Sequence, residues 1–426
     1  MNYNLLEPLC VIESSAFVAA PLAGMTLAQF GADVIRVDQI GGGIDYGRLP
    51  LMPGGRSLYW TGLNKGKRSI AVDLRRAEGR ELVQALATGP GENGGVLLTN
   101  IPTAWLSHST LASRRPDLIS CTISGNADGS TAVDYTVNCA TGYPAVTGGG
   151  SIDTPVNNVL PAWDLACAYQ AAFALVAAVD RRRRTGRGSE LKLALSDVAF
   201  SVLSHLGIMA EAELLGQERP AIGNYIYGAF GRDFGTADSR RIMVAGISAG
   251  QWKALVSACQ LDSGIAELEL RTGLRMSLEG DRYQAREAIA EIIAAWCAAR
   301  SFAQIARIFD EHKVCWGVYR TVGDLLANDP RVSNSSEIFE SIDTAGVGLH
   351  RAAGTPVRSG SDERSTTRPA PLLGQHTDEV LLEVLRLDSA AVGRLHDTGI
   401  VAGPAPRVVG QADCGRTPPP ARSTRS

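Results

Sequence analysis

Short apolar runs alternate with helical segments over the first part of the chain. The pattern predicts a buried strand at residues 9–12, a helix at 21–30 that Pro21 is suited to begin, and a second strand at 32–37. Further apolar runs predict strands at 69–72, 95–98 and 118–124, with a helix at about 80–87 between the first two. This alternation is typical of a parallel sheet covered by helices on both faces. Such a sheet binds ligands at the carboxyl ends of its strands.

The middle of the chain contains its longest apolar run. Residues 165–179 are almost free of charge and predict a buried helix, which four arginines follow at 181–184 and Gly186 ends. A strand at 190–195 and a helical stretch to about residue 215 complete this part.

Beyond residue 218 the composition changes, and a smaller unit follows. We predict a strand at 241–245 and helices near 251–258, 283–299 and 302–312, then a polar, irregular stretch at 333–368 and two short helices at 377–387 and 389–398.

These patterns predict an α/β fold with a Rossmann-like large domain, built on a parallel sheet, and a smaller α+β domain. We expect residues 1–217 to form the N-terminal part of the large domain, 218–330 a linker and the small domain, and 331–404 a part that returns to the large domain. Residues 405–426 are rich in Pro, Arg, Ser and Thr, a composition that predicts disorder.

Composition excludes several classes of function. The net charge of −3 gives no overall positive field for nucleic acid or an anionic membrane. The eight cysteines are scattered without a C-x-x-C pair, which favours reduced thiols in a cytoplasmic protein, and no signal-peptide pattern is visible. We expect the 165–179 run to be too short to cross a membrane, and the six histidines show no metal-ligand spacing.

Two common enzyme classes are disfavoured by their missing motifs. Asp38 follows the second predicted strand, as the ribose-binding acid of dinucleotide folds does, but residues 14–21 contain no glycine. Without a G-x-G-x-x-G turn, a nicotinamide oxidoreductase is disfavoured. The G-x-S-x-G motif of serine hydrolases is absent as well.

Asp164 is the most informative single residue, because it is a lone carboxylate at the head of the long apolar helix. One interpretation is an N-cap, in which the side chain accepts hydrogen bonds from unpaired backbone N–H groups. The other is a nucleophile that the positive end of the helix keeps ionised at the mouth of a site. The neighbouring residues do not decide between the two.

Three other segments carry candidate chemistry. The turn at 64–69, with Lys65, Lys67 and Arg68, is either a phosphate clamp or a solvated basic turn. Asn100, which follows a predicted strand, is either a ligand-binding amide or a plain loop residue. The glycine- and aromatic-rich stretch at 223–235 is either a mobile lid or the entry to a strand.

Taken together, these segments resemble the family III CoA-transferases. The resemblance is carried by residues 20–21, 30–38, 64–74, 119–125, 185–188, 374–381 and 399–401, together with Asn100 and Asp164. It implies that Asp164 is the catalytic carboxylate and that Lys67, Arg68, Asn100, Ile101 and Val18 lie at the CoA site. It also implies an acyl-CoA substrate, an intertwined homodimer, and no metal or redox cofactor. His108 stands near a position where family members often carry arginine.

Within the family, residues 64–69, 133–142, 159–164 and 223–234 look most like members that move CoA between the two carboxylates of mesaconate within one molecule. That likeness implies conversion of mesaconyl-C1-CoA to mesaconyl-C4-CoA through an aspartyl-CoA thioester on Asp164. Family racemases use a His and an acid at positions that Val133 and Ala249 occupy here, so racemisation is disfavoured.

Two alternatives remain open at this point. The first is an intermolecular CoA-transferase acting between an acyl-CoA and a free dicarboxylic acid, although residues 225–235 hold isolated glycines rather than the glycine run of many such enzymes. The second is a protein that binds CoA or a nucleotide without catalysing a reaction.

Overall fold

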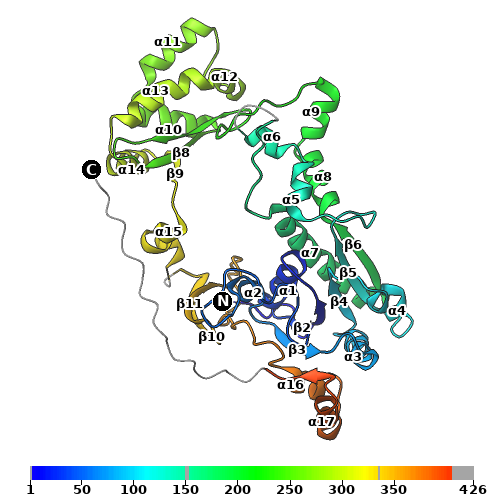
Figure 1. The fold of residues 1–426 in the computed structure, drawn as a ribbon. Coiled ribbons are helices and arrows are strands. Elements are labelled where there is room, and N and C mark those ends of the chain that lie inside the picture. Colours follow the sequence, from blue (N-terminus) through cyan, green and yellow to red (C-terminus); the bar gives the residue numbers. More distant parts are fainter. Residues whose placement is uncertain (1, 149–152, 334–335, 405–426) are drawn as a thin grey trace.

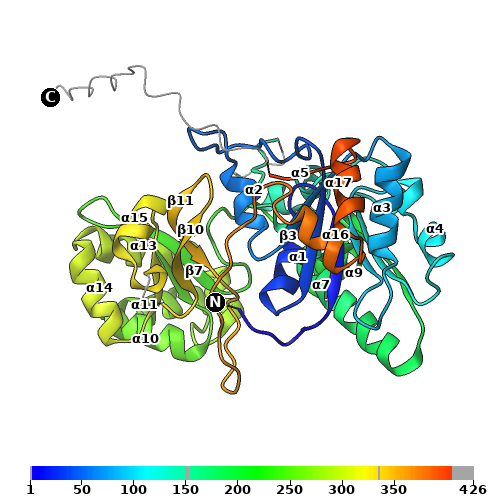
Figure 2. The same ribbon diagram turned by 90° about the horizontal axis from the view of Figure 1, so that it is seen from below.

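The computed structural model describes residues 2–148, 153–333 and 336–404, which form a larger unit and a smaller one. Two stretches of chain join the units, one between α9 (Ile208–Leu215) and β7 (Phe230–Gly235), the other around α15 (Val322–Asn328) (Figure 1). The predicted disordered tail at 405–426 lies outside the described residues. Figure 2 shows the two units side by side, with the small-unit helices at one end of the molecule.

The larger unit is built on a seven-stranded sheet of order β12-β3-β2-β1-β4-β5-β6. Its neighbouring strands pair in parallel, except that the short edge strand β12 runs antiparallel to β3. The predicted α/β class with a mostly parallel sheet is therefore confirmed. The strands are β1 (Cys10–Ser14), β2 (Asp33–Gln39), β3 (Arg68–Val72), β4 (Val96–Thr99), β5 (Ile119–Ser124), β6 (Ser189–Ala194) and β12 (Val401–Ala402).

Helices cover both faces of this sheet, because its strands are apolar on both sides. One core contains residues of α1 (Ala19–Gln29), α7 (Ala162–Thr185) and α8 (Leu195–His205). The other contains residues of α3 (Ala77–Ala87), α16 (Thr377–Glu383) and α17 (Ser389–Asp397). Val401 pairs with Val72, so residues from the end of the described chain complete the edge of the sheet.

The helix α7 is longer than the apolar run that predicted it. It spans 24 residues, and by length and composition alone it could cross a membrane, as could two bent helix pairs. In the fold it packs against α1, α8 and β5, with Cys167, Ala171 and Leu175 almost fully buried. One face of α7 therefore belongs to the core of the larger unit, whereas Tyr169 and Phe173 on the same helix are exposed.

The close approach of α1 to β1 depends on a glycine. A Cβ atom at Gly24 would lie 1.7 Å from Oε2 of Glu13, a fully buried carboxylate on β1. Any side chain at residue 24 would push α1 away from the sheet or displace the carboxylate.

The smaller unit consists of an antiparallel sheet of order β7-β8-β9 with helices packed against it. Residues 223–235 were interpreted either as a mobile lid or as the entry to a strand. Phe230–Gly235 forms β7 and pairs with β8 (Arg241–Gly246), which supports the strand interpretation for that part of the stretch. The patterns missed β9 (Cys315–Val318) and α11 (Asp262–Thr272). The other helices are α10 (Ala249–Cys259), α12 (Glu279–Gln284), α13 (Arg286–Ala298) and α14 (Phe302–Glu311).

The expectation of irregular structure at 333–368 is wrong for its centre. There β10 (Phe339–Thr344) and β11 (Gly348–Ala353) form an antiparallel hairpin, whose polar, half-exposed residues hid the strand pattern. Several short helices were also not predicted, because each is only one or two turns long: α2 (Leu58–Leu63), α4 (His108–Ala112), α5 (Asp134–Cys139), α6 (Tyr143–Thr147) and α15.

Candidate active site

Asp164 lies in the first turn of α7, but it does not cap the helix. The N-cap position is Pro161, and the capping acceptor is another carboxylate, Asp134 at the start of α5. Oδ2 of Asp134 accepts hydrogen bonds from the backbone N–H groups of Trp163 at 2.6 Å and Asp164 at 3.0 Å. The N-cap interpretation of Asp164 is therefore wrong, because Asp134 already occupies the free N–H groups and leaves the Asp164 carboxylate for other partners.

Contacts from α5 and α6 fix this end of α7. The indole Nε1 of Trp163 donates to Oδ1 of Asn138 at 3.0 Å, and the Trp163 ring stacks on Tyr143 with centroids 6.0 Å apart. Asp134 and Trp163 are both buried, at 3% and 6% exposure. Because a buried indole and a buried carboxylate both need hydrogen-bond partners, these contacts hold the backbone of Asp164 in one place.

The electrostatic setting of Asp164 differs from the expectation that the helix start keeps it readily ionised. Burial, and then the negative charge of Asp134, raise the pKa of Asp164 to about 7. Burial also raises the pKa of Asp134. The positive end of the helix acts first on Asp134, so Asp164 carries a desolvated charge with a negative neighbour. A carboxylate of this kind is a stronger base than an exposed aspartate and is half ionised near neutral pH.

Tyr59 is a site residue that sequence reasoning missed. The pKa of its phenol is raised to about 12, chiefly by burial; the charge of Arg48 lowers this pKa, and the charge of Asp164 raises it. Tyr135, 41% exposed on α5, acts on Tyr59 in the same direction as Asp164. A phenol with this pKa stays protonated at neutral pH, so Tyr59 supplies an O–H donor within electrostatic reach of the Asp164 carboxylate.

Asn100 and its neighbours lie where β4 ends. The Asn100 side chain clamps Ala16, because Oδ1 accepts from the Ala16 N–H at 2.8 Å and Nδ2 donates to the Ala16 carbonyl at 2.7 Å. Val18 is buried at 7% exposure, whereas Ile101 is 41% exposed. Asn100 thus shapes the loop after β1, and the contact of these three residues with CoA stays a prediction.

The basic turn at 64–69 does not gather its cations at one surface. Lys67 is 3% exposed, and its Nζ donates to Glu13 Oε1 at 2.8 Å, the Pro21 carbonyl at 2.8 Å and Asn64 Oδ1 at 2.9 Å. Burial lowers the pKa of Lys67 to about 8, although Glu13 opposes that shift. Neither of the two interpretations of the turn, phosphate clamp or solvated surface, describes this buried lysine.

Arg68 and His108 also have protein partners. Arg68 forms ion pairs with Asp33, Glu379 and Glu383 on one side of the sheet. Nδ1 of His108 lies 2.8 Å from Oγ of Ser120. The roles that the family resemblance implies for Lys67, Arg68 and His108 remain predictions.

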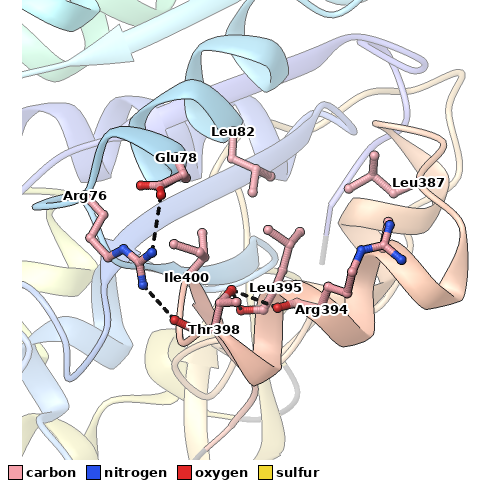
Figure 3. A pocket seen from close by; sticks show the side chains of 9 residues that line it. Arg76, Glu78, Leu82, Leu387, Arg394, Leu395, Thr398 and Ile400 are labelled. Carbon is pink, nitrogen blue, oxygen red and sulfur yellow. Dashed lines mark hydrogen bonds and ion pairs between the residues drawn. The ribbon is translucent and has the colours of Figure 1, made fainter.

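Two surface pockets lie away from Asp164. The first lies between α3 and α17, with Arg76, Leu82 and Arg394 among its lining residues (Figure 3). The second is polar and includes Arg68, Asp33 and Arg368. Neither pocket is lined by Asp164, Tyr59 or Asn100, so the site is defined by the residues around the nucleophile candidate.

Replacing Asp134 tests its effect on Asp164. Asp134→Asn keeps an oxygen acceptor for the two N–H groups but removes the negative charge. We expect the pKa of Asp164 to fall below its value of about 7 and stay above the ordinary value of about 3.9, because burial is unchanged. Carbon-13 NMR titration of the Asp164 carboxyl measures this. The exposed Asp128→Asn serves as control, and an unchanged pKa in Asp134→Asn would contradict the assignment.

Replacing Asp164 tests the cost of its buried charge. An unfolded aspartate has a pKa of about 3.9, so the folded protein binds more protons between about pH 4 and pH 7, and its stability falls as pH rises through that window. Asp164→Asn removes this loss. We expect the variant to be about 1–3 kcal/mol more stable than the wild type at pH 8 and equally stable near pH 4. Urea unfolding at both pH values measures the difference, and equal stability at pH 8 would refute a desolvated Asp164 charge.

Comparison with known proteins identifies the family. The chain is 50% identical over 403 residues to 2-methylfumaryl-CoA isomerase of Chloroflexus aurantiacus, covering 94% of this chain and 98% of that one. It is 26% identical to human succinyl-CoA:glutarate CoA-transferase, over 94% and 90% of the two chains. A crystal structure of a CAIB/BAIF family protein from Brucella suis has the same fold, with a TM-score of 0.73, 24% identity, and coverage of 90% and 100%. Residues 6–377 match the profile of CoA-transferase family III, and the chain belongs to that family.

Proposed function

We propose that this enzyme converts 2-methylfumaryl-CoA (mesaconyl-C1-CoA) to 3-methylfumaryl-CoA (mesaconyl-C4-CoA) by moving CoA within one molecule. The observation that carries the proposal is the 50% identity to 2-methylfumaryl-CoA isomerase over nearly the whole chain. The site supplies a fitting nucleophile, since Asp164 is a partly buried carboxylate within electrostatic reach of a protonated phenol. Exchange of one thioester between carboxylates needs no electron transfer.

The first half-reaction moves CoA from the substrate to the enzyme. The Asp164 carboxylate attacks the C1 thioester carbonyl, the C–S bond breaks, and a mixed anhydride and CoA thiolate form. The thiolate then attacks the aspartyl carbonyl, giving an aspartyl-CoA thioester and free mesaconate. The Tyr59 O–H is a neutral donor near Asp164 that is suited to stabilise the developing oxyanions.

The second half-reaction returns CoA to the other end of the same acid. The C4 carboxylate of mesaconate attacks the aspartyl-CoA carbonyl and expels thiolate, which then attacks the C4 carbonyl of the new anhydride. Mesaconyl-C4-CoA leaves and the Asp164 carboxylate is restored. Because the acid is held beside the thioester, this half-reaction is effectively unimolecular.

Replacing Asp164 tests the chemistry. Asp164→Asn should lower kcat/KM for 2-methylfumaryl-CoA by about a thousandfold or more, because no other group at the site carries CoA. Mass spectrometry locates the thioester in the product, and hydroxylamine trapping should label residue 164 in the wild type. The control is Asp180→Asn, which replaces the exposed aspartate near the other end of α7. Near-wild-type turnover in Asp164→Asn, or label at another residue, would refute the mechanism.

An isotope experiment separates intramolecular from intermolecular transfer. Wild-type enzyme turning over 2-methylfumaryl-CoA with excess labelled mesaconate should give unlabelled product. Label in the C4 thioester would instead favour the intermolecular transferase, and ligand binding without any turnover would favour a catalytically silent protein.

We further propose that the active form is a homodimer, as the family resemblance implies, with the two chains intertwined. Three helices that pack in succession, α7, α8 and α9, expose large apolar side chains, and α9 has no buried residue. Phe173 is 75% and Leu214 79% exposed. Exposed apolar groups on neighbouring helices are typical of a surface that another chain covers. Two separate stretches of chain connect the units (Figure 1), as the intertwined arrangement that the family resemblance implies requires.

Sedimentation equilibrium tests the dimer. The wild type should have twice the mass of one chain, and Phe173→Glu combined with Leu214→Glu should shift it toward the monomer, because two charges would be buried in the interface. The matched control is Leu270→Glu, an 89% exposed leucine on α11 of the smaller unit. A wild type that sediments as a monomer would refute the proposal.

A further inference from the structure

Arg48 is a cation that has no ion pair within the described part of the chain. It lies in the segment between β2 and α2 and is exposed. Its guanidinium carbon lies 4.9 Å from the centroid of the Tyr59 ring and 5.4 Å from that of Phe17. Other arginines of this region, such as Arg36 and Arg56, donate hydrogen bonds from their guanidinium groups to protein acceptors. The described structure gives the Arg48 side chain two aromatic faces and no anion.

Hydrogen bonds with buried residues hold the backbone of Arg48 and Phe17 in place. Asp45 is 1% exposed, and its carbonyl accepts from the Arg48 N–H at 3.1 Å, while its Oδ2 accepts from the Phe17 N–H at 2.9 Å. The hydroxyl of Ser57, just before α2, donates to the Arg48 carbonyl. One buried residue, Asp45, therefore fixes the backbone of Arg48 through its carbonyl and that of Phe17 through its carboxylate.

Phe17 shows that the arrangement is held against local strain. Its φ is 62°, in the left-handed region that a bulky residue rarely adopts. Strain of this kind persists where surrounding contacts enforce it, and it gathers at binding and catalytic sites. Here it turns the ring toward Arg48.

Tyr59 connects Arg48 to the nucleophile. Two charges of opposite sign act on the pKa of its phenol: Arg48 lowers this pKa, and Asp164 raises it. A free positive charge and the candidate nucleophile therefore both lie within electrostatic reach of one hydroxyl.

We propose that Arg48 binds the free carboxylate of a dicarboxylic acyl group while the thioester end reacts at Asp164. The inference rests on the proposed function and names the feature of the substrate that the site selects. The planar guanidinium can hold a carboxylate with two hydrogen bonds, which a flexible ammonium cannot do as well. The two carboxyl groups of mesaconate lie trans across a double bond, so both cannot sit at Asp164 together.

The same contact keeps the intermediate in the site. Once CoA has moved to Asp164, mesaconate has two free carboxylates and no covalent link to the enzyme. Arg48 holds one carboxylate while the other faces the aspartyl-CoA thioester, and the acid turns round by exchanging the carboxylate at Arg48. Each half-reaction then uses the same pair of positions, with Arg48 at one end and Asp164 at the other.

Binding to a variant that cannot turn over tests Arg48 apart from the chemistry. In the Asp164→Asn protein, calorimetry compares 2-methylfumaryl-CoA with tiglyl-CoA, in which a methyl group replaces the free carboxylate. We expect Arg48 to favour the dicarboxylic thioester by about 30- to 100-fold. Adding Arg48→Met should abolish this preference and leave tiglyl-CoA affinity unchanged, and Arg48→Lys should keep part of it. The control is Arg184→Met, an exposed arginine at the far end of α7.

Turnover by proteins that keep Asp164 gives a second readout. Arg48→Met should release free mesaconate and incorporate labelled mesaconate into product, whereas the wild type should do neither. A preference that survives Arg48→Met in the binding experiment would overturn the role of Arg48, whether or not the wild type isomerises. Absence of a C4 thioester from wild-type reactions would overturn the proposed function alone, since the binding preference does not depend on turnover.

Discussion

The geometry of the site depends on a guanidinium that is fully buried. Arg36 on β2 lies 3.0 Å from Asp38, 3.3 Å from Asp45 and 3.5 Å from Glu13, and all four side chains are almost completely shielded from water. A buried cation is tolerated only where its donors are satisfied, and Arg36 also donates to the Ser15 carbonyl and hydroxyl. The cluster joins the ends of β1 and β2 to the loop at Asp45. Without Arg36, three carboxylates would face one another in the interior.

Two carboxylates at the start of α7 have different roles: Asp134 accepts hydrogen bonds from the helix N–H groups, and Asp164 does not. Asp134 satisfies the backbone N–H groups of Trp163 and Asp164, which leaves the side chain of Asp164 free to react. Burial then raises the free energy of the Asp164 anion. In the proposed mechanism, the anhydride or thioester on that carboxylate is neutral, so these covalent forms would escape the desolvation penalty that the free carboxylate bears. The same burial thus favours both a more basic nucleophile and its acylated states.

Sequence patterns predicted the elements whose residues are close neighbours along the chain. The first strands and α1 follow from apolar runs ended by Gly31, and the long apolar run predicted α7. The cap on α7 could not be predicted, because Asp134 is 30 residues away from Asp164 and only α5 brings them together. The electrostatic effect of Asp164 on Tyr59 likewise depends on the tertiary fold, because the two residues are far apart in the sequence. The hairpin at 339–353 was missed because neither face of it is fully buried, so no strict alternation marks it.

The basic residues of this region take different roles according to where their charges are neutralised. Lys67 and Arg36 are compensated inside the protein by Glu13, and so they hold the loop after β1 rather than meet solvent. Arg68 is compensated by acidic residues from β2 and α16. Within the described residues, Arg48 contacts aromatic rings and no counter-ion, and cation–π contacts orient a guanidinium without cancelling its charge. A charge that is oriented but not cancelled stays available to an incoming anion, which is why Arg48, and not the basic turn, best matches the free carboxylate of a substrate.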